Sequence, residues 1–207
     1  ASSAHFDVIG DARLLDLKAS TGSLAVESDG VLTVVGDINA DRDVTLNSAN
    51  RVDVQNSANV SAGNRLSLSA RDVIYAGAGS ASGDEIRIDS GDTLDITGEL
   101  NARDVSLRAA GRLNVSATAN IDAGQVVGGI DMEAGEIVSA SGAQIVGHSI
   151  AALSARGIDM AEGLSVDKAR LHTRGLSGNM KLVTDTDIEL TDVSTSHGSI
   201  EIASAGS

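Results

Sequence analysis

Residues 44–62, VTLNSANRVDVQNSANVSA, contain three pairs of apolar residues, and in each pair a single polar residue separates the two apolar ones. The same arrangement returns in residues 105–123, VSLRAAGRLNVSATANIDA. Two further rounds begin at Leu66 and Ile86, so that the four rounds are separated by 22, 20 and 19 residues. A period near twenty is typical of a solenoid, in which each repeat forms one coil.

Each apolar pair predicts a short β-strand, because residues i and i+2 of a strand point to the same face while the residue between them points to the other. An amphipathic helix would repeat its apolar residues at spacings of three and four, which this stretch does not do. The residues expected to fill the core of the regular zone are Val44, Leu46, Val52, Val54, Leu66, Leu68, Ile86, Ile88, Leu94, Ile96, Val105, Leu107, Leu113 and Val115.

Three strands per round predict an all-β fold, a single-stranded right-handed parallel β-helix, or solenoid, of about ten coils of 19–22 residues. The composition agrees, because a narrow interior of stacked aliphatic residues needs few aromatic side chains, and the chain has one Phe, one Tyr and no Trp. The absence of Pro also agrees, since strand residues donate backbone hydrogen bonds to neighbouring coils. We expect residues 1–207 to be one continuous segment, an internal fragment of a longer rod.

Two regions depart from the regular pattern. Residues 77–83, GAGSASG, stand where the second round should have its third strand, and we expect a flexible turn or bulge there. After Ala123 the apolar pairs continue, for example Ile130/Met132 and Ile158/Met160, but their spacing is less even, so the register of the later coils is not defined by the sequence.

The composition also excludes several classes of function. A net charge of −14 argues against nucleic-acid binding. The chain has no Cys for a thiolate metal site, and no apolar run approaches the length of a membrane-spanning helix. His5, His148, His172 and His197 stand far apart in the sequence, without the spacing of a metal-binding motif. We therefore expect no metal site, no cofactor and no catalytic residues.

One local feature departs from the acidic background. Lys168, Arg170, His172 and Arg174 occupy alternate positions, so a strand would project all four from one face, and no Asp or Glu lies between Asp167 and Asp185. These four residues are the candidate glycan-binding site, an anion site for sulfated or sialylated glycans. A strip of ordinary surface charge is the other interpretation, and both remain open.

The repeats resemble a known family. Coils of 19–22 residues, the sequence GRLNV at residues 111–115 and GDTLDI at residues 91–96 are similar to the repeat region of filamentous haemagglutinins, the Bordetella-type adhesins of two-partner secretion systems. Without proline the chain lacks the Asn-Pro motifs of that family's N-terminal secretion domain, and it also lacks the Arg-Gly-Asp tripeptide associated with integrin binding.

This resemblance implies a structural shaft in a secreted, surface-associated virulence protein that attaches bacteria to host cells. The implied partners of the full-length protein are host cell-surface glycans or receptors and an outer-membrane secretion partner. The alternative is a carbohydrate-active β-helix enzyme, a polysaccharide lyase or hydrolase. Carboxylates gathered in one groove with a basic residue over them would favour the enzyme.

Overall fold

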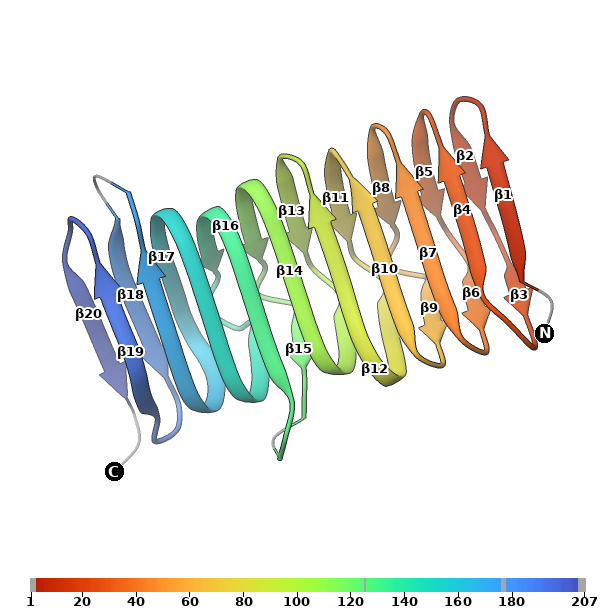
Figure 1. Cartoon of the computed structure of the whole chain (residues 1–207). Helices are drawn as coiled ribbons and strands as arrows, with labels where there is room; N and C mark the ends of the chain where they lie inside the picture. The colour runs from red at the N-terminus through yellow and green to blue at the C-terminus, as the bar shows by residue number, and fades with distance from the viewer. Residues whose placement is uncertain (1–2, 125, 176–177, 205–207) are drawn as a thin grey trace.

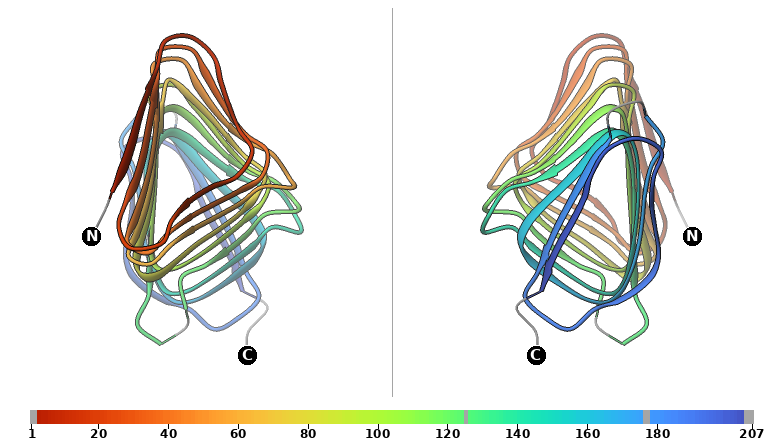
Figure 2. Two further views of the ribbon diagram at one scale, coloured as in Figure 1. Left: turned by 90° about the vertical axis from the view of Figure 1, so that its right-hand side faces the viewer. Right: turned by 90° about the vertical axis from the view of Figure 1, so that its left-hand side faces the viewer.

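The chain folds into one long stack of coils (Figure 1). The computed structural model describes residues 3–124, 126–175 and 178–204. It is all-β, with parallel strands stacked in about 9 turns, which confirms the predicted solenoid. Viewed from the first coil, the chain runs clockwise as it recedes, so the helix is right-handed, and each coil outlines a rounded triangle (Figure 2).

The strands form three faces. The first face contains β1 (Ala4–Val8), β4 (Leu24–Ser28), β7 (Asp43–Ser48), β10 (Arg65–Ala70), parts of β12 (Ala78–Ser90), β14 (Glu99–Val115), β16 (Gly129–Ser139) and β17 (Gln144–Thr173), and β19 (Glu189–Thr195). The longest strands continue around the corners and therefore belong to more than one face.

The second face contains β2 (Ala12–Leu14), β5 (Val31–Val34), β8 (Arg51–Val54), β11 (Asp72–Tyr75), β13 (Thr93–Ile96), further parts of β14, β16 and β17, β18 (Asn179–Thr184) and β20 (Ile200–Ser204). The third contains β3 (Leu17–Ala19), β6 (Asp37–Ala40), β9 (Asn59–Ala62), the first parts of β12 and β14, β15 (Asn120–Asp122) and the first part of β17. Each strand thus pairs with its counterparts in the adjacent coils, which is the single-stranded arrangement predicted.

The register places like residues on like residues. On the first face one inward column runs through Leu24, Val44, Leu66, Ile86, Val105, Ile130 and Ile150. All of the core residues predicted for the regular zone are buried, with 0–2% of their surface exposed. Between them the outward residues are polar, and opposite charges on adjacent coils pair, as do Arg65 and Glu85, whose Nε and Oε2 lie 2.9 Å apart.

The expectation that residues 77–83 replace a strand is wrong, but the expected bulge agrees with a register shift between Ala81 and Glu85 in the pairing of β12 with β14. Residues 78–81 begin β12 and pair with β9 on one side and β14 on the other, so the third strand is present. Gly79 stands between Val60 and Leu100 in the inward column, and the ring of Tyr75 fills the space that its missing side chain leaves. A Cβ at Gly79 would lie 2.1 Å from the Tyr75 hydroxyl oxygen, so the glycine is required by the close approach of the ring.

Tyr75 is fully buried, and its hydroxyl has no hydrogen-bond partner among the residues that the structure describes. Burial raises the pKa of Tyr75 well above its ordinary value of 10.0, because the phenolate would lose its hydration. The ring therefore stabilises its coil through apolar packing at the cost of one unsatisfied polar group.

Hydroxyl groups line the corner at the end of the first face, which the sequence analysis did not predict. Ser28, Ser48, Ser90 and Ser154 are buried, and each donates a hydrogen bond to a backbone carbonyl of the turn, for example from Ser48 Oγ to Gly30 O at 2.5 Å. The Ser48 hydroxyl also accepts a hydrogen bond from the Asn50 N–H at 3.0 Å. These side chains satisfy turn groups that the strand ladders leave unpaired.

One coil is longer than the sequence analysis predicted. Asp104 pairs with Gly129, 25 residues later, instead of the expected 19–22. The additional residues form a protruding loop after β15 (Figure 1), where Val126 and Val127 are 83% and 73% exposed. The strands before and after the loop keep their register, so the loop lengthens the coil without displacing it.

Candidate functional site: a charged groove on the first face

An open groove of about 790 Å³ crosses the middle coils of the first face. Its floor is formed by small outward residues on β14, β16 and β17, namely Ser106, Gly129, Ser149 and Ala151. The register explains the hollow, since Gly129 pairs with Ser149, and neither side chain is long enough to fill the space above the sheet.

The border of the groove carries an excess of positive charge. Its charged lining residues are the cations Arg65, Arg87, Arg103, Arg108, Lys168 and Arg170 and the anions Asp84, Glu85, Asp104 and Asp131. Six positive and four negative groups give a local charge of +2, on a chain whose net charge is −14. Asp89, Glu133 and Asp192 lie outside this lining and pair with Arg87, Arg108 and Arg170, so acids beside the groove offset its positive charge.

Ion pairs hold several of these side chains in place. Arg103 bridges Asp104 and Asp84 at 3.0 and 3.1 Å, and the hydrogen bond and charge of Asp104, together with Asp84, raise the pKa of Arg103. Arg87 binds Asp89 at 2.6 Å, which raises the pKa of Arg87 in the same way. These guanidinium groups are therefore positive at neutral pH.

The four residues of the predicted strip do project outward, but they do not form one uninterrupted basic surface. Lys168 and Arg170 line the groove, whereas Arg174 lies just beyond the end of β17 and lines a neighbouring hollow. His172 lines neither hollow: its Nδ1 lies 2.6 Å from Ser194 Oγ. The structure thus brings two of the four candidates into a common site.

The next coil partly neutralises the strip. Asp192 of β19 lies 3.7 Å from Arg170 Nε and 3.1 Å from His172 Nε2, and Glu189 is the register partner of Lys168. Arg170 Nε is also 3.2 Å from His172 Nε2. His172 Nε2 can accept the hydrogen bond from Arg170 or, when it carries a proton, pair with Asp192, but it cannot do both at once. Lys168 forms no ion pair with any described residue.

Sequence reasoning missed these acids because it searched along the chain, where none lies near the strip. In a β-helix the lateral neighbours of a residue are about twenty positions away. It also missed Arg87, Arg103 and Arg108 for the same reason. Placing the outward residues of successive coils side by side would have brought Arg87, Ser106, Asp131 and Ala151 into one column.

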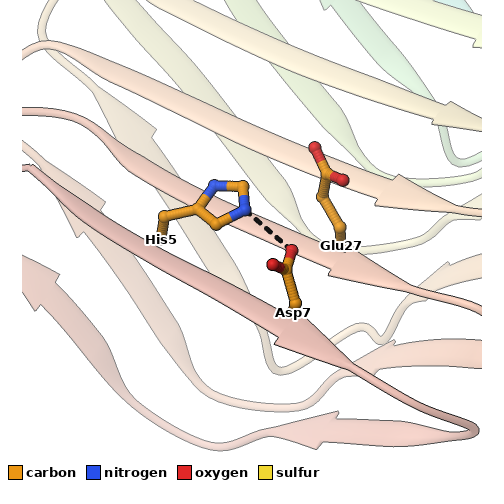
Figure 3. Close-up of side chains that lie close together, drawn as sticks. All are labelled: His5, Asp7 and Glu27. Atoms are coloured by element: carbon orange, nitrogen blue, oxygen red, sulfur yellow. Dashed lines mark hydrogen bonds and ion pairs between the residues drawn. The ribbon is translucent and has the colours of Figure 1, made fainter.

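A second group of side chains lies at the other end of the same face. His5 and Asp7 project from β1, and Glu27 projects from β4 beside them (Figure 3). Potential metal-ligand atoms of these three exposed side chains all lie within 4.8 Å of one another. The sequence predicts no metal site because it has no Cys and its histidines lack the spacing of a metal-binding motif, and Glu27 is a whole coil away from His5.

Comparison of the chain with protein-family models, with curated proteins and with solved structures finds no match. No helix in the described part of the chain is long and apolar enough to cross a membrane. The function therefore has to be inferred from the geometry of the molecule and from the pattern of its sequence.

Proposed function

We propose that this chain is part of the structural shaft of a secreted bacterial surface adhesin, and that its charged groove adds weak binding to sulfated glycans. The observation that carries the shaft is the parallel pairing of successive coils, in which each strand pairs only with its counterparts in the adjacent coils. Such a stack gains length with every repeat at nearly constant width, which suits a rod that holds binding regions away from a cell surface. The resemblance of the repeats to filamentous haemagglutinins supports the same role.

Surface exposure of the natural protein tests the shaft. Antibodies raised against residues 1–207 should label intact cells that produce the protein, and brief protease treatment of those cells should remove the label. Deletion of the gene should reduce attachment of the cells to host cells. Labelling that appears only after lysis of the cells would contradict a surface adhesin.

The groove supports the glycan-binding part of the proposal. Lys168 and Arg170 occupy alternate positions of one strand, so their charges lie about 7 Å apart. Arg87 and Arg108 approach the same hollow from coils on its other side. Sulfate groups along a glycan could contact both sets, and each contact would be weak because the groove is open to water and salt.

Retention on a heparin column tests this binding. We expect the chain to be retained at low salt and to elute before physiological ionic strength, because salt screens exposed charges within about 10 Å. The double variant Lys168→Glu/Arg170→Glu should not be retained. Its folding should be unchanged, because both side chains are exposed and project from the sheet.

A matched control separates the groove from the total charge. Arg13→Glu/Lys18→Glu changes the net charge by the same amount at exposed positions in the first coil, far from the groove. It should leave most of the retention intact. Equal loss in both double variants, or no retention of the unmodified chain at low salt, would leave this segment as shaft only.

A carbohydrate-active enzyme is the second candidate, because the groove gathers four carboxylates beside arginines. The geometry favours it less. The general acid of a glycoside hydrolase is kept protonated by burial, whereas the side chains of Asp104 and Asp131 are 47% and 54% exposed and lie within 3.0 and 3.8 Å of arginine nitrogens. Shortening of a sulfated glycan during incubation with the chain, abolished by Asp104→Asn or Asp131→Asn, would establish the enzyme instead.

A further inference from the structure

The side chains of His5, Asp7 and Glu27 meet on the outer surface of the first two coils (Figure 3). His5 and Asp7 occupy alternate positions of β1, so both point to the same side of the sheet. Glu27 belongs to β4 and is the register partner of Asp7 one coil later. The backbone of two paired strands therefore fixes where all three side chains begin.

Their polar atoms are already close together. His5 Nε2 lies 2.7 Å from Asp7 Oδ1, and one potential ligand atom from each of the three residues lies within 4.8 Å of the others. The side chains of His5 and Asp7 are 53% and 75% exposed, so small rotations about their side-chain bonds meet no packed neighbour. Atoms at these separations can converge on one ion at bond lengths of ~2.0–2.2 Å.

From this geometry we propose that His5, Asp7 and Glu27 bind a divalent transition-metal ion of the zinc type. An imidazole nitrogen and two carboxylate oxygens form a donor set that suits Zn²⁺ and its first-row neighbours. Ca²⁺ takes six to eight oxygen ligands and has no use for the imidazole. The two carboxylates also match the charge of the ion.

The surroundings leave room for water in the remaining coordination positions. Asp7 and Glu27 line an open hollow of about 420 Å³, and Asn47, the register partner of Glu27 on the third coil, lines it too. The site is thus a surface site with three protein ligands and open positions.

Bound metal would join β1 to β4 through side chains in addition to the strand hydrogen bonds. A ligand that binds only the folded state stabilises it by mass action. Among the strands that the structure describes, β1 pairs with β4 alone, and Phe6 on this strand is 44% exposed. The metal should therefore raise the protection of the β1 amides against hydrogen exchange more than that of the central strands.

Isothermal titration of the tag-free chain with Zn²⁺, in a buffer that does not bind metals, tests the site. We expect one ion per chain at this site. His5→Ala, Asp7→Asn and Glu27→Gln should each weaken binding by more than about tenfold, because changes in the outer shell alone alter metal affinity by ~10–100-fold. Melting in EDTA should be the same for all variants, because the side chains are exposed.

Two further variants sharpen the test. His148→Ala removes a histidine that also contacts an aspartate, with Nδ1 2.9 Å from Asp167 Oδ2, but belongs to no such three-residue group within the described chain, and it should leave Zn²⁺ affinity unchanged. Ala25→His should strengthen binding. Ala25 is the register partner of His5 and precedes Glu27 by two residues, so the new imidazole would face the same ion.

The outcomes separate clearly. Weakening by the three ligand substitutions, with His148→Ala unchanged, supports the site. Equal affinity for Ca²⁺, Mg²⁺ and Zn²⁺, or a Zn²⁺ affinity that His5→Ala leaves unchanged, would contradict the site, because the ions would then be attracted only by surface charge. Zn²⁺ binding that none of the three substitutions affects, or no binding at all, would overturn the proposal.

Discussion

A single methyl group added at Gly79 should destabilise the protein through its collision with Tyr75. A Cβ built on Gly79 lies 2.1 Å from Tyr75 Oη, 2.9 Å from Tyr75 Cζ and 3.3 Å from Leu100 Cδ2. Overpacking of this kind costs ~1–3 kcal/mol. The loss of chain entropy in the unfolded state offsets ~0.4–1 kcal/mol of that cost. We expect Gly79→Ala to lower the free energy of unfolding by about 1–2 kcal/mol.

Tyr75→Phe should have the opposite sign. It removes a buried hydroxyl without a partner among the described residues, a group whose desolvation costs ~1–3 kcal/mol. It also removes the atom nearest the new methyl group. Gly79→Ala should therefore cost less in the Tyr75→Phe background, with a coupling free energy of at least ~0.5 kcal/mol.

Urea unfolding followed by far-ultraviolet circular dichroism measures all four proteins, since Tyr75 is the only tyrosine and its fluorescence is lost in the two proteins that carry Tyr75→Phe. Gly91→Ala is the control, because a Cβ there has its nearest neighbour at an ordinary 3.4 Å. If Gly79→Ala lowers the free energy of unfolding equally in both backgrounds, or no more than Gly91→Ala does, the Tyr75 ring does not occupy the space that a side chain at position 79 would need.

Three further predictions concern pH, alternation and the corner hydroxyls. Because the pKa of Tyr75 is raised in the folded state, the contribution of its proton to the free energy of unfolding is fully present below about pH 10. Above about pH 10 the unfolded chain loses this proton while the folded chain keeps it, so the free energy of unfolding falls by up to ~1.4 kcal/mol per pH unit. Urea midpoints between about pH 9 and pH 11 should therefore fall less steeply for Tyr75→Phe than for the unmodified chain. Leu107→Asp should cost several kcal/mol by burying a charge, whereas Ser106→Asp, which faces outward, should be nearly silent in a thermal melt. Ser48→Ala should lower the free energy of unfolding by ~1 kcal/mol, because it removes two hydrogen bonds of the turn. Ser69→Ala, at an exposed position, should change the urea midpoint little. Equal effects of the two substitutions would mean that the hydrogen bonds of the corner hydroxyls do not stabilise the fold.

The fold could be predicted from the sequence because the burial of apolar side chains, which stabilises it, follows a pattern that is visible within a few consecutive residues. Alternation within five residues determines which side chains face inward, and the repeat distance determines which strands pair. Val44 and Leu66 could be placed in one column without knowing any contact. The later coils could not be aligned with the same certainty, because the 25-residue coil shifts the spacing between Asp104 and Gly129.

The features that sequence reasoning missed all depend on contacts across coils or around a corner. Asp192 is remote from Arg170 in the sequence and 3.7 Å away in space, and Glu27 is equally remote from His5. The inward position of Gly79 looked empty because the ring that fills it comes from another face of the same coil. Hydroxyls such as Ser48 looked like turn residues because hydrophobic patterning does not reveal which polar groups are buried and bonded.

The protruding loop after β15 shows that strand pairing, and not the number of residues in a coil, maintains the repeat. The chain leaves the stack after residue 123 and re-enters at Gly129 in register with Asp104, while Val126 and Val127 lie in solvent. A peptide inserted at this point would begin and end where the native loop does, and exposed loop tips are the sites that best accept insertions. The solenoid could therefore display a foreign epitope or a fused domain there, in a fixed position along its length, with the neighbouring coils undisturbed.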